Sequence, residues 1–312
     1  MREYTTTNTN PFVDLSHEVW GWEIPVYLFL GGLVAGMMVI SGYFFLSGRW
    51  RNRDSSSYVL PALSLILLSA GMLALFLDLE HKLYVWRLYL TFEVTSPMSW
   101  GSWILLLVYP VLIASLLLAL PAALRERSPS LAKLSDRIQT RPSAVRSIGA
   151  LNIALGIMVG IYTGILLSAL GARPLWSSAL LGPLFLVSGV STAAALVDLV
   201  AKDHSERDLV SRADIGFMIT ELLFIALFLI GLMNTSKVHQ EAAGLLLGGP
   251  FTAVFWVLVV GLGLLVPIVI QTLTATHRIR HTVVAPVLVL VGGLVFRMVM
   301  VSAGQLTHWT AM

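Results

Sequence analysis

Long apolar segments separated by short polar ones make up nearly the whole chain. Eight of them are recognisable, at residues 22–47, 59–79, 101–122, 145–170, 177–200, 213–234, 250–274 and 283–305. As a helix that rises about 1.5 Å per residue, each can cross a hydrocarbon layer about 30 Å thick. A transmembrane β-barrel would need segments of roughly ten residues with alternating polarity, and the apolar runs do not alternate. The pattern predicts an all-α integral membrane protein with eight transmembrane helices.

The spans form one predicted membrane domain, in which the longest loop, 123–146, separates two possible halves. That loop is rich in charged residues, so we expect it to be solvated. We expect an interfacial periplasmic segment at 1–21, a membrane domain at 22–305 and a periplasmic tail at 306–312. Within the membrane domain, one possible half consists of 22–122 together with 145–170, and the other of 177–305.

Two of the spans begin alike. Residues 28–30, Leu-Phe-Leu, lead into the small residues Gly32 and Gly36, and residues 184–186, again Leu-Phe-Leu, lead into Ser188 and Thr192. A parallel internal repeat would produce this similarity. Small residues four apart also allow helices to pack closely, so both interpretations stay open.

Composition agrees with a membrane location and limits the chemistry. Charged residues are only 12% of the chain, about half of what a soluble domain carries. The chain has no cysteine, which excludes a disulfide, and no haem or iron–sulfur cluster is expected in this chain. Lys and Arg do not form blocks interleaved with aromatic residues, so we expect no nucleic acid partner. The polar start of the chain lacks a basic region and a small-residue cleavage site, so no cleaved signal peptide is predicted.

The distribution of basic residues predicts the orientation. The loops after spans one, three, five and seven contain fourteen Lys and Arg residues, and the other loops and the N-terminal segment contain five. Because basic loops stay in the cytoplasm, both termini are expected on the non-cytoplasmic side. We predict a multi-pass protein of a bacterial or archaeal inner membrane, surrounded by membrane lipids.

Polar side chains from several spans are expected at one depth near the outer face. Ionisable groups inside a membrane are costly and mark functional sites, although at span ends polar residues are also ordinary. The candidates are Glu23, Tyr27, Asp78, His81, Ser99, Trp100, Ser102, Tyr162 and Gln305. Hydroxyl and carboxyl groups beside an apolar wall suit a quinone, whose carbonyl oxygens need hydrogen bonds and whose reduced form releases protons.

A second polar set lies deeper or toward the inner side. Its members are Asn152, Asp198, Asp214, Glu221, Gln271 and Arg297. One interpretation is a buried ion pair between Glu221 and Arg297 that joins two helices. The other is a proton path through Asp198, Asp214, Glu221 and Arg297 toward the outer site. None of the seven histidines lies well inside a span, which argues against a haem held by two histidines.

Four stretches resemble the NrfD/PsrC family, the membrane subunits of polysulfide, nitrite and related reductases and of alternative complex III. They are Trp20 to Gly36, Thr95 to Trp103, Tyr162 to Trp176, and Arg297 to Gln305. The resemblance implies two four-helix bundles and menaquinone or ubiquinone near the outer face. It also implies a ferredoxin-like iron–sulfur subunit on the periplasmic face that exchanges electrons with a molybdenum enzyme or a multihaem cytochrome.

The resemblance also places the quinone ligands. They map onto Tyr27, Asp78 and Tyr162, with contributions from Glu23, His81 and Trp100. Some members of the family carry histidine where this chain has Tyr27, and tyrosine is a poor proton acceptor at neutral pH. The acceptor role then falls to a carboxylate or to His81.

The expected function is therefore electron exchange between the quinone pool and a partner subunit, in either direction, with possible proton conduction. The chain holds no redox centre of its own and has no predicted enzymatic activity alone. Two alternatives from other classes remain, a membrane transporter and a structural anchor without a quinone site. A transporter would place its polar groups at broken helices in mid-membrane.

Overall fold

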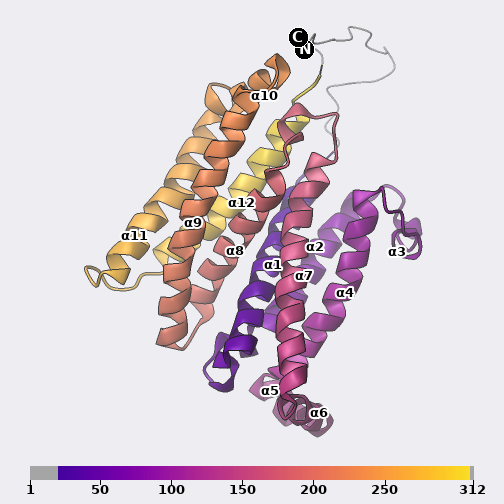
Figure 1. Cartoon of the computed structure of the whole chain (residues 1–312), viewed down its shortest axis with the longest axis vertical. Coiled ribbons are helices and arrows are strands. Elements are labelled where there is room, and N and C mark those ends of the chain that lie inside the picture. Colours follow the sequence, from indigo (N-terminus) through magenta and orange to yellow (C-terminus); the bar gives the residue numbers. More distant parts are fainter. Residues whose placement is uncertain (1–19, 310–312) are drawn as a thin grey trace.

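A computed structural model describes residues 20–309 of the chain, and every regular element in that range is a helix (Figure 1). Eight helices are long and apolar enough to cross a membrane. They are α1 (Glu23–Ser47), α2 (Leu60–Asp78), α4 (Pro97–Leu118), α7 (Pro142–Ser168), α8 (Leu181–Val200), α9 (His204–Met233), the continuous pair η5 (Val254–Leu265) and α11 (Val266–Ala275), and α12 (Val284–Gln305). The predicted fold class is confirmed. The interfacial segment expected at 1–21 lies almost entirely outside the described residues.

The ends of the helices follow local chemistry that hydropathy does not record. α9 begins at His204, well before the apolar run that starts near 213, because the Asp203 side chain accepts a hydrogen bond from the Ser205 N–H and caps the helix. α4 begins at Pro97, where a proline fits the first helical turn. Polar first turns therefore extend some helices beyond their apolar spans.

Shorter helices lie in the loops between the spans. They are α3 (Arg87–Leu90), α5 (Ala122–Arg127), α6 (Pro129–Gln139) and α10 (Lys237–Leu247), with single 3₁₀ turns η1 (Arg49–Arg51), η2 (Ser56–Tyr58), η3 (Lys82–Tyr84) and η4 (Pro174–Trp176). The sequence pattern did not predict them. In the long loop, Arg125 of α5 pairs with Asp136 of α6, and the Gln139 amide donates to the Leu118 carbonyl at 2.8 Å. The loop is thus folded against the end of α4.

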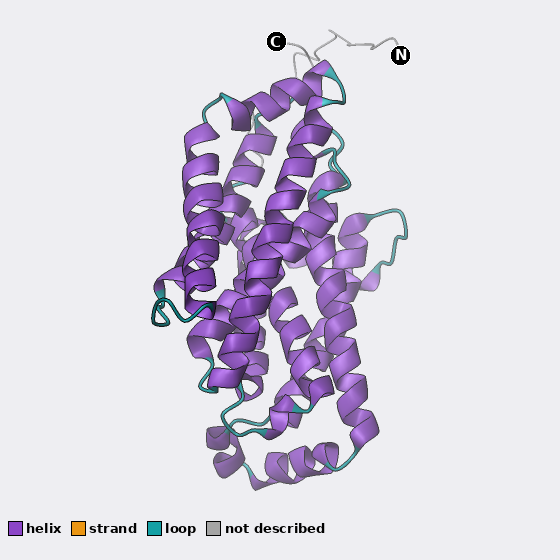
Figure 2. Cartoon of the chain, turned by 60° about the vertical axis from the view of Figure 1, so that its left-hand side comes forward, coloured by secondary structure: helices purple, strands orange, loops and turns teal. Residues whose placement is uncertain are grey.

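The long helices run side by side along the longest axis of the molecule, and loops join them at the helix ends, some of which lie away from the two ends of the molecule (Figure 2). α1 packs against α2 and α7, and α4 packs against the same two helices. In the second half of the chain, α8 packs against α9 and α12, while η5 packs against α12 and α11 against α9. Contacts of α1 and α7 with α8 join the two sets (Figure 1). These contacts are the ones expected of two four-helix bundles. The division of the chain into two such bundles stays a prediction.

Small residues allow α1 and α8 to come close to backbone contact. A Cβ atom built on Gly36 would lie 2.5 Å from the Gly189 carbonyl oxygen, and one built on Gly189 would lie 2.5 Å from the Gly32 carbonyl oxygen. The close contact supports the packing interpretation of the small residues. On α8, however, Gly189 and Ala193 form this contact, each one residue after the expected Ser188 and Thr192. The internal repeat stays an interpretation.

The seventh span differs from a regular α-helix. Its first part, η5, is a π-helix of 12 residues, followed at the second position of α11 by Pro267. Proline lacks an N–H group and is tolerated only where no intrahelical hydrogen bond needs it. Within η5, a Cβ atom on Gly263 would lie 2.8 Å from the Gly292 Cα atom of α12, so these two backbones also nearly touch.

Substitution of Gly36 by alanine tests the crossing of α1 and α8. We expect Gly36→Ala to lower the free energy of unfolding by about 1–3 kcal/mol, because the added methyl group must displace backbone atoms of α8. Heating of the detergent-purified protein, followed by size-exclusion chromatography, measures this loss.

Gly231→Ala on α9 is the matched control. A Cβ atom there meets no atom within 4 Å, and alanine is the better helix former, so stability is expected to be equal or higher. Equal melting temperatures for Gly36→Ala and the parent protein would contradict the crossing.

Candidate functional site

Two buried tyrosines from different helices lie close together near the end of the bundle where α1 begins. The Tyr27 phenol of α1 is close enough to those of Tyr162 of α7 and Tyr89 of α3 to interact with them electrostatically. Tyr27 is 5% exposed and Tyr162 is 7% exposed. Among the described residues, neither hydroxyl group has a hydrogen-bond partner. The pair therefore offers two uncommitted polar groups in an apolar wall.

Gly101 of α4 makes room for one of these rings. A Cβ atom on Gly101 would lie 2.1 Å from the Tyr162 phenol oxygen. The ring of Tyr162 thus packs directly on the α4 backbone, and the ring of Tyr27 lies beside Gly71 of α2, whose added Cβ atom would be 3.8 Å from the Tyr27 Cδ2 atom. Four helices, α1, α2, α4 and α7, meet at the two tyrosines.

Two carboxyl groups lie together at the same end. Asp78, the last residue of α2, interacts electrostatically with Glu23, in the first turn of α1, and with Lys82. Glu23 is well placed for the positive end of the α1 macrodipole, whereas Asp78 at the C-terminal end of α2 is not. Within residues 20–309, neither side chain has a hydrogen bond or an ion pair to another side chain.

Other predicted members of the outer site are engaged with the backbone. Ser99 donates to the Thr91 carbonyl at 3.2 Å and accepts from the Glu93 N–H at 3.0 Å. Trp100 donates to the Val94 carbonyl at 2.7 Å, and its side chain is exposed. Ser102 donates to the Leu88 carbonyl at 2.7 Å. These three side chains of α4 hold the backbone of residues 88–94, the segment that precedes this helix, by hydrogen bonds.

Gln305 and His81 are the remaining members of the predicted outer set. The Gln305 amide pairs with the Trp20 backbone, accepting from its N–H at 2.8 Å and donating to its carbonyl at 3.0 Å. Trp20 stacks on Trp176 at 5.3 Å between ring centroids. Gln305 thus joins the start of α1 to the end of α12, which places the two ends of the described chain at the same end of the bundle. His81 is exposed and lies beside Tyr84.

The deeper polar residues of the second half form three successive groups. Near the end of α8, Asp198 accepts from the His281 Nε2 atom at 2.9 Å, with Arg207 at 3.9 Å. Asp214 of α9 accepts from Ser191 at 2.6 Å and from Gln271 at 2.8 Å. Asp214 interacts electrostatically with both Asp198 and Glu221, so it lies between them.

The third group corrects one expectation. The structure forms no direct ion pair between Glu221 and Arg297 within 4.0 Å among the described residues. Arg297 of α12 instead donates to the Ser188 hydroxyl at 3.1 Å and to the Phe185 carbonyl at 3.0 Å, and its guanidinium lies 4.0 Å from the Phe185 ring centroid. Ser188 is also the hydrogen-bonding neighbour of the Glu221 carboxyl group. α8 therefore lies between the Glu221 carboxyl group and the Arg297 guanidinium, and the Ser188 hydroxyl of α8 contacts both groups.

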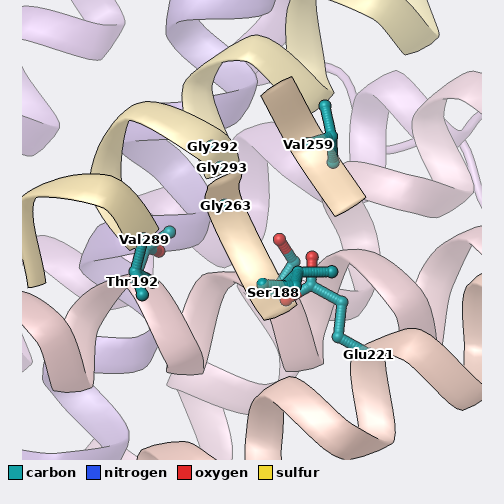
Figure 3. Close-up of a pocket in the computed structure, with 9 residues that line it drawn as sticks. Ser188, Thr192, Glu221, Val259, Gly263, Val289, Gly292 and Gly293 are labelled. Atoms are coloured by element: carbon teal, nitrogen blue, oxygen red, sulfur yellow. The ribbon is translucent and has the colours of Figure 1, made fainter. Parts of the chain in front are cut away.

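A small cavity lies beside this group. Its volume is about 10 Å³, and its lining includes Ser188, Glu221, Gly263 and Gly292, with the Glu221 side chain extending from α9 toward Ser188 (Figure 3). A cavity of this size has room for about one water molecule. The buried Arg297 Nε atom and the Gln271 Oε1 atom have no partner within residues 20–309, which is a reason to expect ordered water in this region.

Asn152 does not belong to this series. Its amide donates to Ser115 of α4 at 2.6 Å and to the Ile148 carbonyl at 2.8 Å. It lies in the first half of the chain and ties α7 to α4.

Comparison with known proteins agrees with this architecture. The family model described as "Polysulphide reductase, NrfD" matches residues 7–308. This chain belongs to the NrfD family. A polysulfide reductase chain of Wolinella succinogenes is 30% identical over 306 residues, which cover 92% of this chain and 94% of that protein. Protein NrfD of Escherichia coli K12 is 31% identical over 306 residues, covering 93% of this chain and 96% of that protein.

A third relative, a selenate reductase subunit of Mesobacillus selenatarsenatis, is 26% identical over 296 residues, covering 85% of this chain and 69% of that protein. The predicted resemblance is confirmed. The predicted localisation, as a multi-pass protein of the bacterial inner membrane, is supported by the eight apolar helices and by membership of this family.

Several residues of these sites were not predicted from the sequence. Gly101 lies in one of the four resembling stretches, yet nothing in the pattern pairs it with Tyr162. His281 lies in a loop and meets Asp198 across 83 residues of sequence. Ser191 is an ordinary small polar residue of an apolar span. Only the three-dimensional arrangement of the helices identifies these partners.

Arg173 binds the C-terminal end of α12. Its guanidinium donates to the carbonyls of Gln305 and Thr307 and lies 2.9 Å from the Nδ1 atom of His308. Burial, and to a smaller extent the Arg173 charge, lowers the pKa of His308. Burial also lowers the pKa of Arg173. Only the neutral imidazole can accept a hydrogen bond from Arg173.

The Arg173–His308 contact is expected to weaken in acid. Because the pKa of His308 is lowered in the folded protein, its contribution to stability is complete above the ordinary histidine pKa of about 6.5 and is lost as the pH falls below it. Hydrogen exchange of residues 305–309, measured between about pH 8 and pH 5 and corrected for the intrinsic rate, should show declining protection. His308→Gln should abolish that pH dependence, and unchanged protection across this range in the parent protein would contradict the contact.

Proposed function

We propose that this chain is the quinone-reactive membrane subunit of a respiratory reductase complex. Its relatives include a chain of polysulfide reductase and a subunit of selenate reductase, which supports assembly with other oxidoreductase subunits. The observation that carries the quinone assignment is the pair of buried, uncommitted phenols of Tyr27 and Tyr162 beside the carboxyl groups of Asp78 and Glu23. A phenol hydroxyl without an internal partner can form its hydrogen bonds with a bound ligand.

The residues at this site fit a quinone head group. When bound, a quinone or quinol supplies two-electron, two-proton chemistry to the complex. The phenols of Tyr27 and Tyr162 can donate hydrogen bonds to two carbonyl oxygens, or accept them from the reduced form. The surrounding wall of α1, α2, α4 and α7 is apolar, as ligand sites of this kind are.

The carboxyl groups would handle the protons. Asp78 is half-buried and has no hydrogen-bonding partner among residues 20–309, so it can hold a proton without breaking an internal contact. Glu23 lies beside it and can receive that proton. The same residues serve quinol oxidation and quinone reduction, and the partner subunits decide the direction.

The proposed partner is a ferredoxin-like iron–sulfur subunit on the periplasmic face, connected further out to a molybdenum enzyme or a multihaem cytochrome. This chain has no cysteine and therefore carries no iron–sulfur cluster of its own. Electrons must be transferred directly between the quinone site and a centre in a neighbouring chain. The position of the tyrosines near one end of the bundle makes that distance short.

Substitutions of Asp78 and Tyr162 test the quinone site. In the assembled complex, Asp78→Asn should lower kcat for quinol oxidation by about a hundredfold, because general acid–base groups contribute on the order of 10²–10⁴ in rate. Tyr162→Phe should raise KM for the quinol several-fold, as expected from the loss of one hydrogen bond of about 1 kcal/mol. Steady-state kinetics with a soluble quinol analogue measures both.

Two conservative variants are matched controls. Tyr109→Phe removes a phenol that pairs with Ser69 on α2 at 3.3 Å, and Glu80→Gln removes an exposed carboxylate near Asp78. Both should retain parental kinetics. Normal kcat and KM in Asp78→Asn and Tyr162→Phe would favour a structural anchor, and uptake of a solute by the isolated chain in liposomes would favour a transporter.

A second proposed function is proton conduction between the inner side and the middle of the membrane. The observation that favours it is the series His281–Asp198, Ser191–Asp214–Gln271 and Glu221–Ser188–Arg297, which ends at the water-sized cavity. His281 is part-exposed at the inner end, where protons can enter. Charged residues in a membrane interior commonly form such relays.

Glu221→Gln separates proton conduction from a structural role. We expect it to abolish proton translocation per electron in liposomes, measured with a pH-sensitive dye, while quinol turnover under uncoupled conditions stays close to that of the parent. Glu241→Gln, which alters an exposed side chain of α10, should change neither quantity. Unaltered translocation together with a lower melting temperature would assign Glu221 to structure alone.

A further inference from the structure

An apolar groove opens where the two halves of the protein meet. Its volume is about 330 Å³, and side chains from α1, α7, α8 and α9 line it, among them Tyr43, Ile153, Ala194, Leu209 and Phe217. No polar surface lines its wall. The groove is therefore unsuited to a solute or to a quinone head group, both of which need polar partners.

The groove lies in the half of the membrane opposite to the tyrosine site. Tyr43 is one turn before the end of α1 at Ser47, so it lies about 6 Å from that end. Ala194 lies about 9 Å from the end of α8 at Val200. Both ends face the side that carries most of the basic loops. The groove thus opens into the hydrocarbon of the cytoplasmic leaflet, where acyl chains are the abundant apolar groups.

Basic side chains surround the inner end of the groove. Arg49, just after α1, donates to the Ser205 hydroxyl at the start of α9 at 3.2 Å, which places it about one helical turn before the groove residue Leu209. On α7, Arg146 is seven residues before Ile153 and therefore on the same face, two turns closer to the inner end. It is exposed.

A third arginine adds to this charge. Arg212 is exposed on α9 between Leu209 and the groove residue Ala213. Among the described residues, none of the three arginines forms an ion pair within 4.0 Å. The nearby Asp203 carboxylate accepts from the Ser205 N–H and from Asn52. The exposed Asp208 carboxylate lies one turn before Arg212 on α9 and does not pair with it within 4.0 Å. The mouth of the groove therefore carries three arginines that no carboxylate of the described residues pairs with directly.

We propose that the groove binds one acyl chain of an anionic glycerophospholipid of the cytoplasmic leaflet, whose phosphate group is held by Arg49, Arg146 and Arg212. Arginine binds phosphate oxygens with two parallel hydrogen bonds. The Tyr43 ring lies at the depth where aromatic side chains meet the head groups. The lipid fills the seam between α1 and α9 and so stabilises the contact between the two halves.

Native mass spectrometry of the full-length protein in detergent tests this assignment. Titration with phosphatidylglycerol should give a stoichiometric adduct, and phosphatidylethanolamine should bind much more weakly. The double variant Arg146→Gln/Arg212→Gln should bind phosphatidylglycerol about 25-fold more weakly, because each basic residue near a membrane surface contributes about fivefold. The control Lys133→Gln/Arg137→Gln removes the same charge from α6 and should bind like the parent.

A second pair of variants tests the groove itself. Ala213→Phe places a ring into the groove and should abolish the adduct and the rise in melting temperature that phosphatidylglycerol produces. Ile219→Phe adds a ring to the exposed face of the same helix and should leave both unchanged. Quinol turnover should be retained in all four variants, since none alters the tyrosine site.

Four results would overturn the proposal. They are equal binding of the two lipids, parental affinity in the double arginine variant, displacement of the lipid by a long-chain quinone at equimolar concentration, and a dimer of the protein that Ala213→Phe dissociates. The third would assign the groove to an isoprenoid tail, and the fourth to a second copy.

Discussion

A membrane interior offers no hydrogen bonds to a polypeptide, so a polar group of this protein inside the spans is costly unless the chain, water or a ligand satisfies it. The backbone meets this demand by being helical throughout the spans. Small side chains meet it locally, since Ser115 and Thr163 donate to carbonyls of their own helices. Larger polar groups need partners on neighbouring helices. Asp214 receives hydrogen bonds from both α8 and α11, so the polar residues also determine which helices lie together.

The two polar regions differ in how completely this demand is met. In the second half of the chain, Asp198, Asp214 and Arg297 each have two or more partners. In the first half, Tyr27 and Tyr162 have buried rings with uncommitted hydroxyl groups. A network of partnered groups is suited to pass protons along fixed positions, and its buried Arg297 Nε and Gln271 Oε1 atoms, which have no partner among the described residues, leave places for water. An unsatisfied pair is suited to receive a ligand, because binding then supplies the missing hydrogen bonds.

Glycine positions the elements that form both regions. The contact of Gly36 with Gly189 brings α1 against α8, and the contact of Gly263 with Gly292 brings η5 against α12. The contact between α1 and α8 holds the two halves together, and the apolar groove opens where the same halves meet. The contact between η5 and α12 lies in the wall of the small cavity beside Glu221. π-Helical segments are frequently found at functional sites, and η5 provides three residues of this wall.

The eight spans could be predicted from the amino-acid sequence, because burial in lipid requires long apolar runs that can be counted along the chain. The sequence also determined which residues are polar within them, and hence both sets of candidates. Which candidates meet depends on the fold in three dimensions. Gln305 and Ser99 form hydrogen bonds with the backbone, whereas Gly101 and His281 came from outside the predicted sets. Ser188 separates Glu221 from Arg297 because α8 lies between their helices. Hydropathy fixes depth in the membrane, but rotation and neighbours depend on side-chain packing between helices distant in sequence.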